Sequence, residues 1–135
     1  MCNNMMRSYV KKREDFARKP IAVKRKEVWI VVDGRIPSVA DGLKELGYSN
    51  VVLCRQDAEP QTMHDMLNKM NLWPLVFVTR NRDDFLDLSF REYTMMWATR
   101  RYPITKMSAK IDAVIQRYGF HIDGDFNLSL PYNTY

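Results

Sequence analysis

Short apolar segments alternate with amphipathic segments through the middle of this chain. Three runs are apolar at nearly every position and are short enough to be strands: 28–32, 51–54 and 75–78. Continuous apolar runs of this length are typical of parallel strands that are covered on both faces. We therefore expect these three segments to be buried strands of one central sheet.

Two segments between these strands have apolar residues at helical spacing. The first helix is expected to follow an N-cap at Ser38 and to end at Gly47. The second is expected from about Gln61 to Met70, with a methionine-rich face that packs in the core. The apolar positions are Val39, Ala40, Leu43 and Leu46 in the first helix and Met63, Met66, Leu67 and Met70 in the second.

The C-terminal third continues the same pattern. Residues 93–98 are expected to form a fourth strand, and a last helix is expected to open at Pro103 and Thr105 and to close at Gly119. An Asp-Gly turn lies between apolar residues in 120–126 and predicts a terminal hairpin. The sequence thus predicts an α/β domain over 27–135, with a central, mostly parallel sheet flanked by helices.

Charge separates the N-terminal segment from this domain. Residues 1–26 hold nine Lys and Arg against two acidic residues, whereas the remainder holds twelve against fourteen. The segment has no sustained periodicity, so we expect a mobile basic arm. Such an arm suits phosphate backbones, and Lys11, Lys12 and Arg13 are its candidate nucleic-acid contacts. The alternative is a solvated leader that only keeps the protein in solution.

Several classes of protein are not favoured by the sequence. No apolar run approaches the roughly 20 residues that span a bilayer. The N-terminus lacks the apolar stretch of a signal peptide. Cys2 and Cys54 cannot form a disulfide framework and fit no metal-binding spacing. We therefore expect a cytoplasmic protein without a membrane partner.

Acidic and amide side chains follow each of the first three predicted strands. Asp33 follows the first strand, Asp57 and Glu59 follow the second, and Asn81, Asp83 and Asp84 follow the third. In an open α/β sheet, ligands bind beyond the carboxyl ends of the strands. Carboxylates gathered there repel one another unless a cation or a proton intervenes. The pattern predicts a divalent-metal site and metal-assisted phosphodiester hydrolysis.

Two motifs resemble those of compact PIN-like nucleases. In residues 33–48, an aspartate ends the first strand and a helix with Leu-x-x-Leu-Gly-Tyr spacing follows. In residues 76–85, a strand ends in Thr-Arg, and an amide residue and then acidic residues precede a phenylalanine. The resemblance covers roughly residues 28–126. It implies a three-layer PIN-like fold, a Mg²⁺ or Mn²⁺ site, and hydrolysis of single-stranded RNA.

The resemblance also assigns roles to individual residues. Asp33 matches the first family aspartate, and Asp83 or Asp84 matches the final acidic position. The metal ligands implied are Asp33, Asp83 and Asn81, although Asn81 replaces an aspartate that many members of the group have. The family's helix-start carboxylate has no unique counterpart here, because Asp57 and Glu59 precede the predicted helix and Asp65 lies within it.

Further residues complete the expected site. Asp57 or Glu59 is expected to orient water, so both are counted with Asp33, Asp83 and Asp84 as catalytic candidates. Three arginines lie beside these carboxylates in the sequence and could hold the scissile phosphate: Arg35, Arg80 and Arg82.

Two alternatives to an active nuclease stay open. The first is a nucleic-acid-binding module on a PIN-like scaffold that has lost catalysis, because Asn81 removes a charge from the acidic cluster. The second is a structural or antitoxin-binding protein with an occluded acidic pocket. A homodimer is also expected at the level of the family.

Overall fold

The structure is a computed structural model of the 135-residue chain, and it describes residues 23–55, 57–85, 88 and 90–131. Most of the expected basic arm, including Lys11, Lys12 and Arg13, lies outside the described residues. In the described part of the chain, no helix is both long enough and apolar enough to cross a bilayer.

A five-stranded sheet forms the centre of the molecule. All four pairings between neighbouring strands are parallel, and the strand order is β2-β1-β3-β4-β5. The strands are β1 (Trp29–Val32), β2 (Asn50–Leu53), β3 (Leu75–Thr79), β4 (Thr94–Trp97) and β5 (Asp125–Asn127). The chain leaves β1 toward β2 on one side and returns to pair β3 on the other, so the direction of winding reverses at β1.

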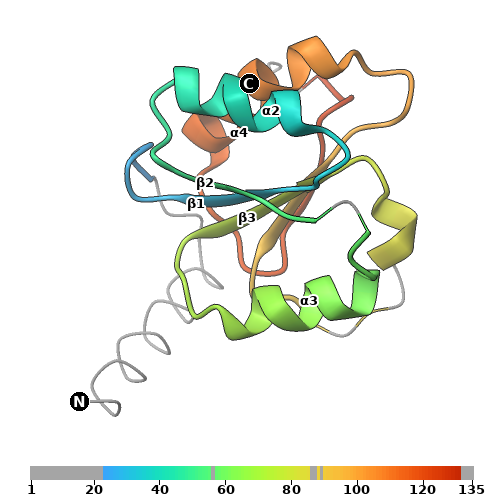
Figure 1. Cartoon of the computed structure of the whole chain (residues 1–135). Helices are drawn as coiled ribbons and strands as arrows, with labels where there is room; N and C mark the ends of the chain where they lie inside the picture. Colours follow the sequence, from blue (N-terminus) through green and yellow to red (C-terminus); the bar gives the residue numbers. More distant parts are fainter. Residues whose placement is uncertain (1–22, 56, 86–87, 89, 132–135) are drawn as a thin grey trace, which may run out of the picture.

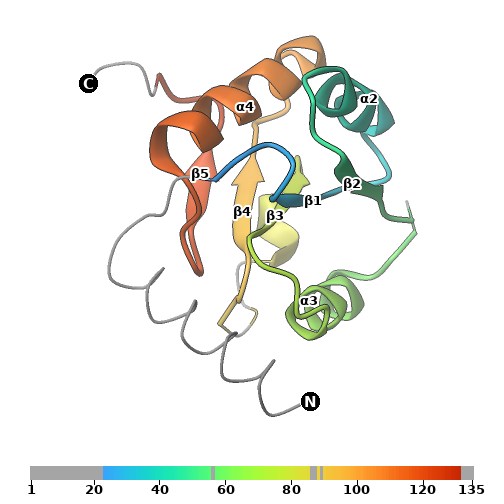
Figure 2. The ribbon, with the colours of Figure 1, turned by 90° about the vertical axis from the view of Figure 1, so that its left-hand side faces the viewer.

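Helices cover both faces of this sheet and give three layers (Figures 1 and 2). The helices α2 (Pro37–Glu45) and α4 (Met107–Tyr118) lie together on one face, and α3 (Pro60–Lys69) lies on the other. Two short 3₁₀ helices, η1 (Arg82–Phe85) and η2 (Ile104–Lys106), complete the described elements. The three-layer α/β prediction is confirmed.

The alternation of side chains along the strands divides the core in two. Ile30, Val32 and Val78 pack in the cluster under α2 and α4. Val31 and Phe77 pack in the cluster that contains Met63 and Leu67 of α3. Strands that bury both faces need apolar residues at every position, which explains why β1 and β3 read as unbroken apolar runs.

The second strand differs from its prediction, because β2 lies at an edge of the sheet rather than in its interior. Val52 is 40% exposed and Leu53 is 48% exposed. The prediction that 51–54 is a buried strand is therefore wrong. Its sequence resembles that of a central strand, but the fold gives it only one neighbour.

Three smaller expectations also need correction. The first helix begins at Pro37, after Ile36 in the N-cap position, so Ser38 is helical and does not cap it. The Asp-Gly turn leads into β5, which pairs in parallel with β4, so the terminal hairpin is wrong. On α3 the buried face comprises Met63, His64 and Leu67, whereas Met66 is 42% exposed.

Candidate functional site

Asp33 lies at the point where the winding of the sheet reverses. It directly follows β1, and the strand register places it between Cys54 after β2 and Thr79 at the end of β3. Its N–H donates to the Val78 carbonyl at 2.9 Å. The residue is only 4% exposed. This is the crevice in which open α/β sheets bind ligands.

Arg35 engages both carboxylate oxygens of Asp33. Its Nε donates to Oδ1 at 3.1 Å and its Nη2 donates to Oδ2 at 2.9 Å, in the bidentate geometry that suits this pair. The Arg35 backbone N–H also donates to Oδ1 at 3.0 Å. The hydroxyl of Thr79, which is fully buried, donates to Oδ2 at 2.9 Å. Asp33 is therefore held in one orientation by four hydrogen bonds.

These contacts fix the charge of Asp33. Burial by itself raises the pKa of this carboxyl group. The hydrogen bonds from Arg35 and Thr79, together with the positive charge of Arg35, outweigh burial and hold the pKa below its ordinary value. Asp33 is thus a buried carboxylate that is ionised at neutral pH and neutralised by one guanidinium.

The segment after β3 closes the other side of Arg35. Asn81 donates its backbone N–H to the Thr79 hydroxyl at 3.0 Å. With its amide oxygen turned toward Arg35, Asn81 accepts from both terminal nitrogens of that guanidinium, at 3.0 and 3.1 Å. The Asp84 carboxylate lies 3.9 Å from Arg35 Nη2. Arg35 therefore contacts Asp33 and Asn81 and lies near Asp84.

Two pockets adjoin at Asp33 and Arg35, and they differ in charge. The first has a volume of about 240 Å³, and its charged lining residues are four carboxylates and two guanidinium groups: Asp33, Asp57, Glu59, Asp84, Arg35 and Arg55. We call it the acidic pocket. The second has a volume of about 350 Å³ and is lined by Asp33, Arg35, Ile36, Arg80, Asn81, Arg100 and Ile104. We call it the arginine pocket.

The structure brings most of the predicted acidic residues together. Asp33, Asp57, Glu59 and Asp84 all line the acidic pocket, although they come from three separate segments. Asp84 rather than its neighbour Asp83 takes part in this lining. Asp57 is exposed and forms a bidentate pair with Arg55, which lowers the pKa of Asp57. Asp65 lies on the exposed side of α3 and accepts from Gln61.

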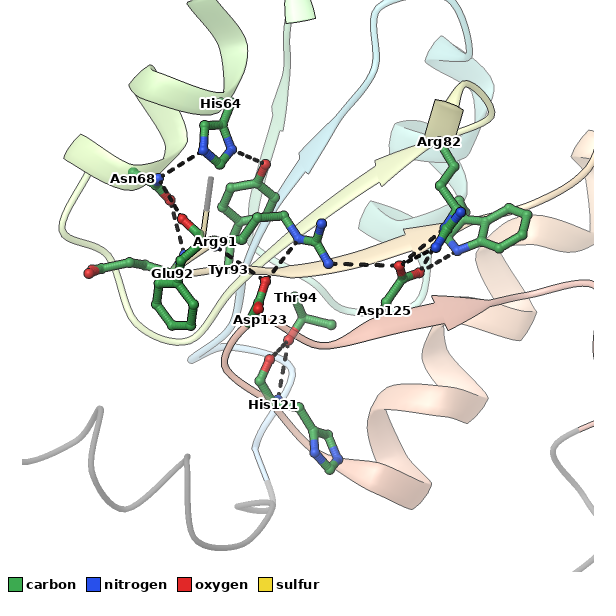
Figure 3. Close-up of polar contacts among 12 residues, drawn as sticks. His64, Asn68, Arg82, Arg91, Glu92, Tyr93, Thr94, His121, Asp123 and Asp125 are labelled. Atoms are coloured by element: carbon green, nitrogen blue, oxygen red, sulfur yellow. Dashed lines mark hydrogen bonds and ion pairs between the residues drawn. The ribbon is translucent and has the colours of Figure 1, made fainter. Parts of the chain in front are cut away.

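The predicted arginines divide between two places. Arg35 and Arg80 line the arginine pocket, and Arg80 Nη2 also donates to the Thr99 and Arg100 carbonyls, which joins the segment after β3 to the segment after β4. Arg82 points to the other side of η1. There it pairs with Asp125 of β5 at 3.0 Å and lies over the Trp97 ring (Figure 3).

Sequence reasoning missed two residues of this site. Thr79 is one, and its signal is its position at the end of β3, directly beside Asp33 across the strand pair. Arg100 is the other; it follows β4 and lines the arginine pocket. Only the placement of β4 beside β3 brings Arg100 here, so no local motif could have indicated it.

A divalent cation such as Mg²⁺ requires oxygen ligands that are free to contact it. In the described ranges no three His, Cys, Asp or Glu side chains lie close enough together to hold a metal ion. Both oxygens of Asp33 are engaged by Arg35, and one of them also by Thr79. The Arg35 side chain is 46% exposed, so the ion pair borders solvent. As long as Arg35 holds these contacts, neither oxygen of Asp33 is open to a Mg²⁺ or Mn²⁺ ion.

Comparisons with known proteins identified no relative of this chain. No family model, no curated protein and no solved structure matches the chain.

Proposed function

We propose that this protein binds a phosphodiester group of single-stranded nucleic acid, with RNA as the expected ligand, in the arginine pocket. The observation that carries the proposal is the pair of adjoining pockets of opposite charge that share Asp33 and Arg35. Three guanidinium groups and one carboxylate line the arginine pocket. Guanidinium groups match the planar, bidentate geometry of phosphate oxygens.

Arg80 gives this pocket an unused donor. Its Nε is buried and has no hydrogen-bond partner within the described part of the chain. Buried donors are rarely left unpaired, and those that are call for an explanation. Because this nitrogen has almost no accessible surface, an anionic oxygen in the arginine pocket would pair with it after a shift of the Arg80 side chain. The resemblance to PIN-like nucleases favours RNA as the source of that oxygen.

Adjacent arginines provide a matched test of this proposal. Arg100 lines the arginine pocket, whereas Arg101 is exposed and is not among its lining residues. Binding of the full chain to a fluorescein-labelled single-stranded RNA can be followed by fluorescence polarisation at constant salt. Arg100→Gln should weaken binding about 3- to 10-fold, the loss of one phosphate contact. Arg101→Gln should stay close to wild type, and equal losses in the two variants would contradict the proposal.

Hydrolysis of the bound RNA is a second candidate function, and the acidic pocket favours it. Mg²⁺ or Mn²⁺ would supply a Lewis acid for the phosphoryl oxygens. Asp33 and Asp84 would hold the ion, and Asp57 or Glu59 would orient water from the rim of the pocket. Arg35 would hold the phosphate once it releases Asp33.

Cleavage of single-stranded RNA in the presence of Mn²⁺ tests this second function. Asp33→Ala should abolish cleavage, and Asp84→Asn should reduce it far more than Asp83→Asn, since only Asp84 lines the acidic pocket. Cleavage by Asp33→Ala at the wild-type rate would assign the activity to a contaminant and end the claim. Binding by fluorescence polarisation is scored separately, so the two functions fail independently.

A further inference from the structure

Side chains that the resemblance assigns to a metal ion surround a guanidinium group instead. Asp33 and Asn81 belong to the expected ligand set, and Asp84 is the acidic residue after β3 that lines the acidic pocket. Arg35 donates to both oxygens of Asp33, at 3.1 and 2.9 Å. With the Asn81 amide oxygen turned toward it, Arg35 also donates to that oxygen from both terminal nitrogens. The Asp84 carboxylate lies 3.9 Å from the same guanidinium. One cation is therefore already present among these groups.

The position of Arg35 follows from the turn after β1. Arg35 lies two residues beyond Asp33, and its backbone N–H donates to Oδ1 of Asp33 at 3.0 Å. The Ile36 N–H donates to the Asp33 carbonyl at 3.0 Å and closes the turn. This is an Asx turn, in which an aspartate side chain accepts from the backbone two residues on. The turn therefore keeps Arg35 close to Asp33.

The hydrogen bonds to Asp33 leave no room for a further ligand. An ionised carboxylate offers about four lone-pair sites. Oδ1 accepts from the backbone N–H and from Nε of Arg35, and Oδ2 accepts from Nη2 of Arg35 and from the Thr79 hydroxyl. All of these sites are therefore filled, and two of the four donors belong to the Arg35 guanidinium.

The charges at the site match a singly charged cation. Asp33 is buried, and its one negative charge is balanced by the one positive charge of Arg35. Asn81 supplies an oxygen without a charge, where an aspartate would place a second carboxylate against the guanidinium. The Asp84 side chain is 44% exposed, so water screens its charge. The buried part of the site is thus neutral with Arg35 in place.

We infer that the Arg35 guanidinium takes the place of a divalent cation at Asp33, so that the chain without nucleic acid binds neither Mg²⁺ nor Mn²⁺ there. Loss of the guanidinium would free one lone-pair site on each oxygen of Asp33. Asp33, Asp84 and the Asn81 amide oxygen could then hold an ion whose shell is completed by water. The inference does not rest on the proposed function. Hydrolysis, the second candidate function, would additionally require that RNA draw Arg35 away from Asp33.

Binding of MnCl₂ to the full chain without RNA tests the inference, with free Mn²⁺ measured by electron paramagnetic resonance. Wild type and Asp33→Asn should bind Mn²⁺ equally weakly. Arg35→Ala should bind one ion per chain at least about 10-fold more tightly than wild type, because a charge in contact with a carboxylate changes its affinity for a proton by about that factor or more. Asp33→Asn in the Arg35→Ala chain should abolish this gain.

Arg55→Ala is the matched control for charge. It removes one positive charge from the lining of the same acidic pocket, but Arg55 pairs with Asp57 rather than with Asp33. A general effect of charge would raise the affinity for Mn²⁺ equally in the two alanine variants. The inference predicts the gain with Arg35→Ala alone.

Thermal denaturation followed by circular dichroism provides a second readout. Arg35→Ala leaves Asp33 buried without its counter-ion, so this variant should be less stable than wild type. Mn²⁺ should raise the Tm of Arg35→Ala, because a ligand that binds only the folded state stabilises it, and should leave the wild-type Tm unchanged. Arg35→Gln keeps one amide donor for Asp33 and is a second variant with the same expected gain.

Two results would overturn the inference. The first is Mn²⁺ binding by wild type that Asp33→Asn removes. The second is a pair of folded chains, Arg35→Ala and Arg35→Gln, that bind Mn²⁺ no more tightly than Arg55→Ala. Neither result depends on RNA, so this inference and the proposed function fail independently.

Discussion

A single carboxylate decides how the candidate site is charged. Asp33 is buried, ionised and bound by Arg35 and Thr79. This arrangement leaves the second half of the Arg35 guanidinium facing Asn81 and near Asp84. The same guanidinium can neutralise Asp33 or contact an incoming phosphate. Whether the Asp33–Arg35 ion pair is formed or broken therefore decides whether Arg35 is available to a phosphate.

The first prediction concerns the acid stability of the fold. The pKa of Asp33 is lower in the folded chain than its ordinary value of 3.8. The stabilisation that its ionised form provides is therefore complete well above pH 3.8, and it is lost as the pH falls from there through the lower, folded pKa. Asp33→Asn lacks this contribution and should reduce the free energy of unfolding at pH 7 by about 1–3 kcal/mol.

Urea denaturation of both chains between pH 7 and pH 3 measures this effect. The difference between wild type and Asp33→Asn should be constant from pH 7 to pH 5 and should shrink below about pH 4. Asp41→Asn serves as the control, because Asp41 is exposed on α2. A difference that grows as the pH falls would contradict the assigned charge state.

At the scale of single residues, the sequence indicated where a side chain lies in the fold better than it indicated which side chain it contacts. Asp33 and the Asp83–Asp84 pair could be assigned to one crevice because parallel strands end at the same edge, but only the structure places Asp84 rather than Asp83 in the pocket lining. The partner of Arg82 could not be assigned, because Asp125 lies 43 residues away and becomes its neighbour only through the pairing of β4 with β5. Arg100 joins the site for the same reason.

The helices and strands show where periodicity is a sufficient guide and where it is not. Within the described residues, apolar spacing placed all three α-helices and four of the five strands to within a few residues. It did not give the rotation of α3, where the buried face runs through His64 rather than Met66. His64 is buried because its Nδ1 lies 3.0 Å from the Tyr93 hydroxyl, a tertiary contact that hydrophobic spacing does not indicate (Figure 3).

The rotation of α3 leads to a second prediction. Leu67 is 1% exposed and packs among Val31, Phe77 and Tyr93. Leu67→Ala should reduce the free energy of unfolding by about 2–4 kcal/mol, because it opens a cavity in a packed core. Met66→Ala should change it by less than about 0.5 kcal/mol, because Met66 is 42% exposed. Chemical denaturation at low protein concentration measures both, and equal costs would show that the helix is rotated differently.

The edge position of β2 also could not be predicted from the sequence. Its apolar run matches that of β1, and neither run states how many neighbours the strand has. The terminal hairpin was predicted from a local Asp-Gly signal, and the parallel pairing of β5 with β4 overrode it. Local turn chemistry fixes a turn, whereas the sheet decides which strand the chain then joins.

At the scale of the whole molecule, charge separates the basic N-terminal segment from a slightly acidic remainder. Most of this segment lies outside the described residues. If the arm contacts phosphates, it adds affinity by releasing counterions and carries no sequence preference. The pocket would then position one phosphodiester, and the arm would hold the flanking strand.

The third prediction follows from this division. Replacing Lys11, Lys12 and Arg13 with glutamine should weaken RNA binding and should reduce the slope of log affinity against log salt by roughly 2, because about 0.7 counterions are released per phosphate contact on a single strand. Fluorescence polarisation at 50 to 200 mM salt measures the slope. Lys106, Lys110 and Arg117 provide a matched triple replacement on the α4 side, and it should leave the slope nearly unchanged. A slope equal to that of wild type in the arm variant would show that these three residues make no phosphate contacts.

The central claim is that a phosphate group enters the arginine pocket beside Asp33. A crystal structure of the full chain with a short single-stranded RNA tests it most directly. The account predicts a phosphate within hydrogen-bond distance of the Arg80 and Arg100 guanidinium groups, with Arg35 turned toward it. RNA bound to another surface, with the Asp33–Arg35 pair intact and no phosphate between Arg80 and Arg100, would contradict the account.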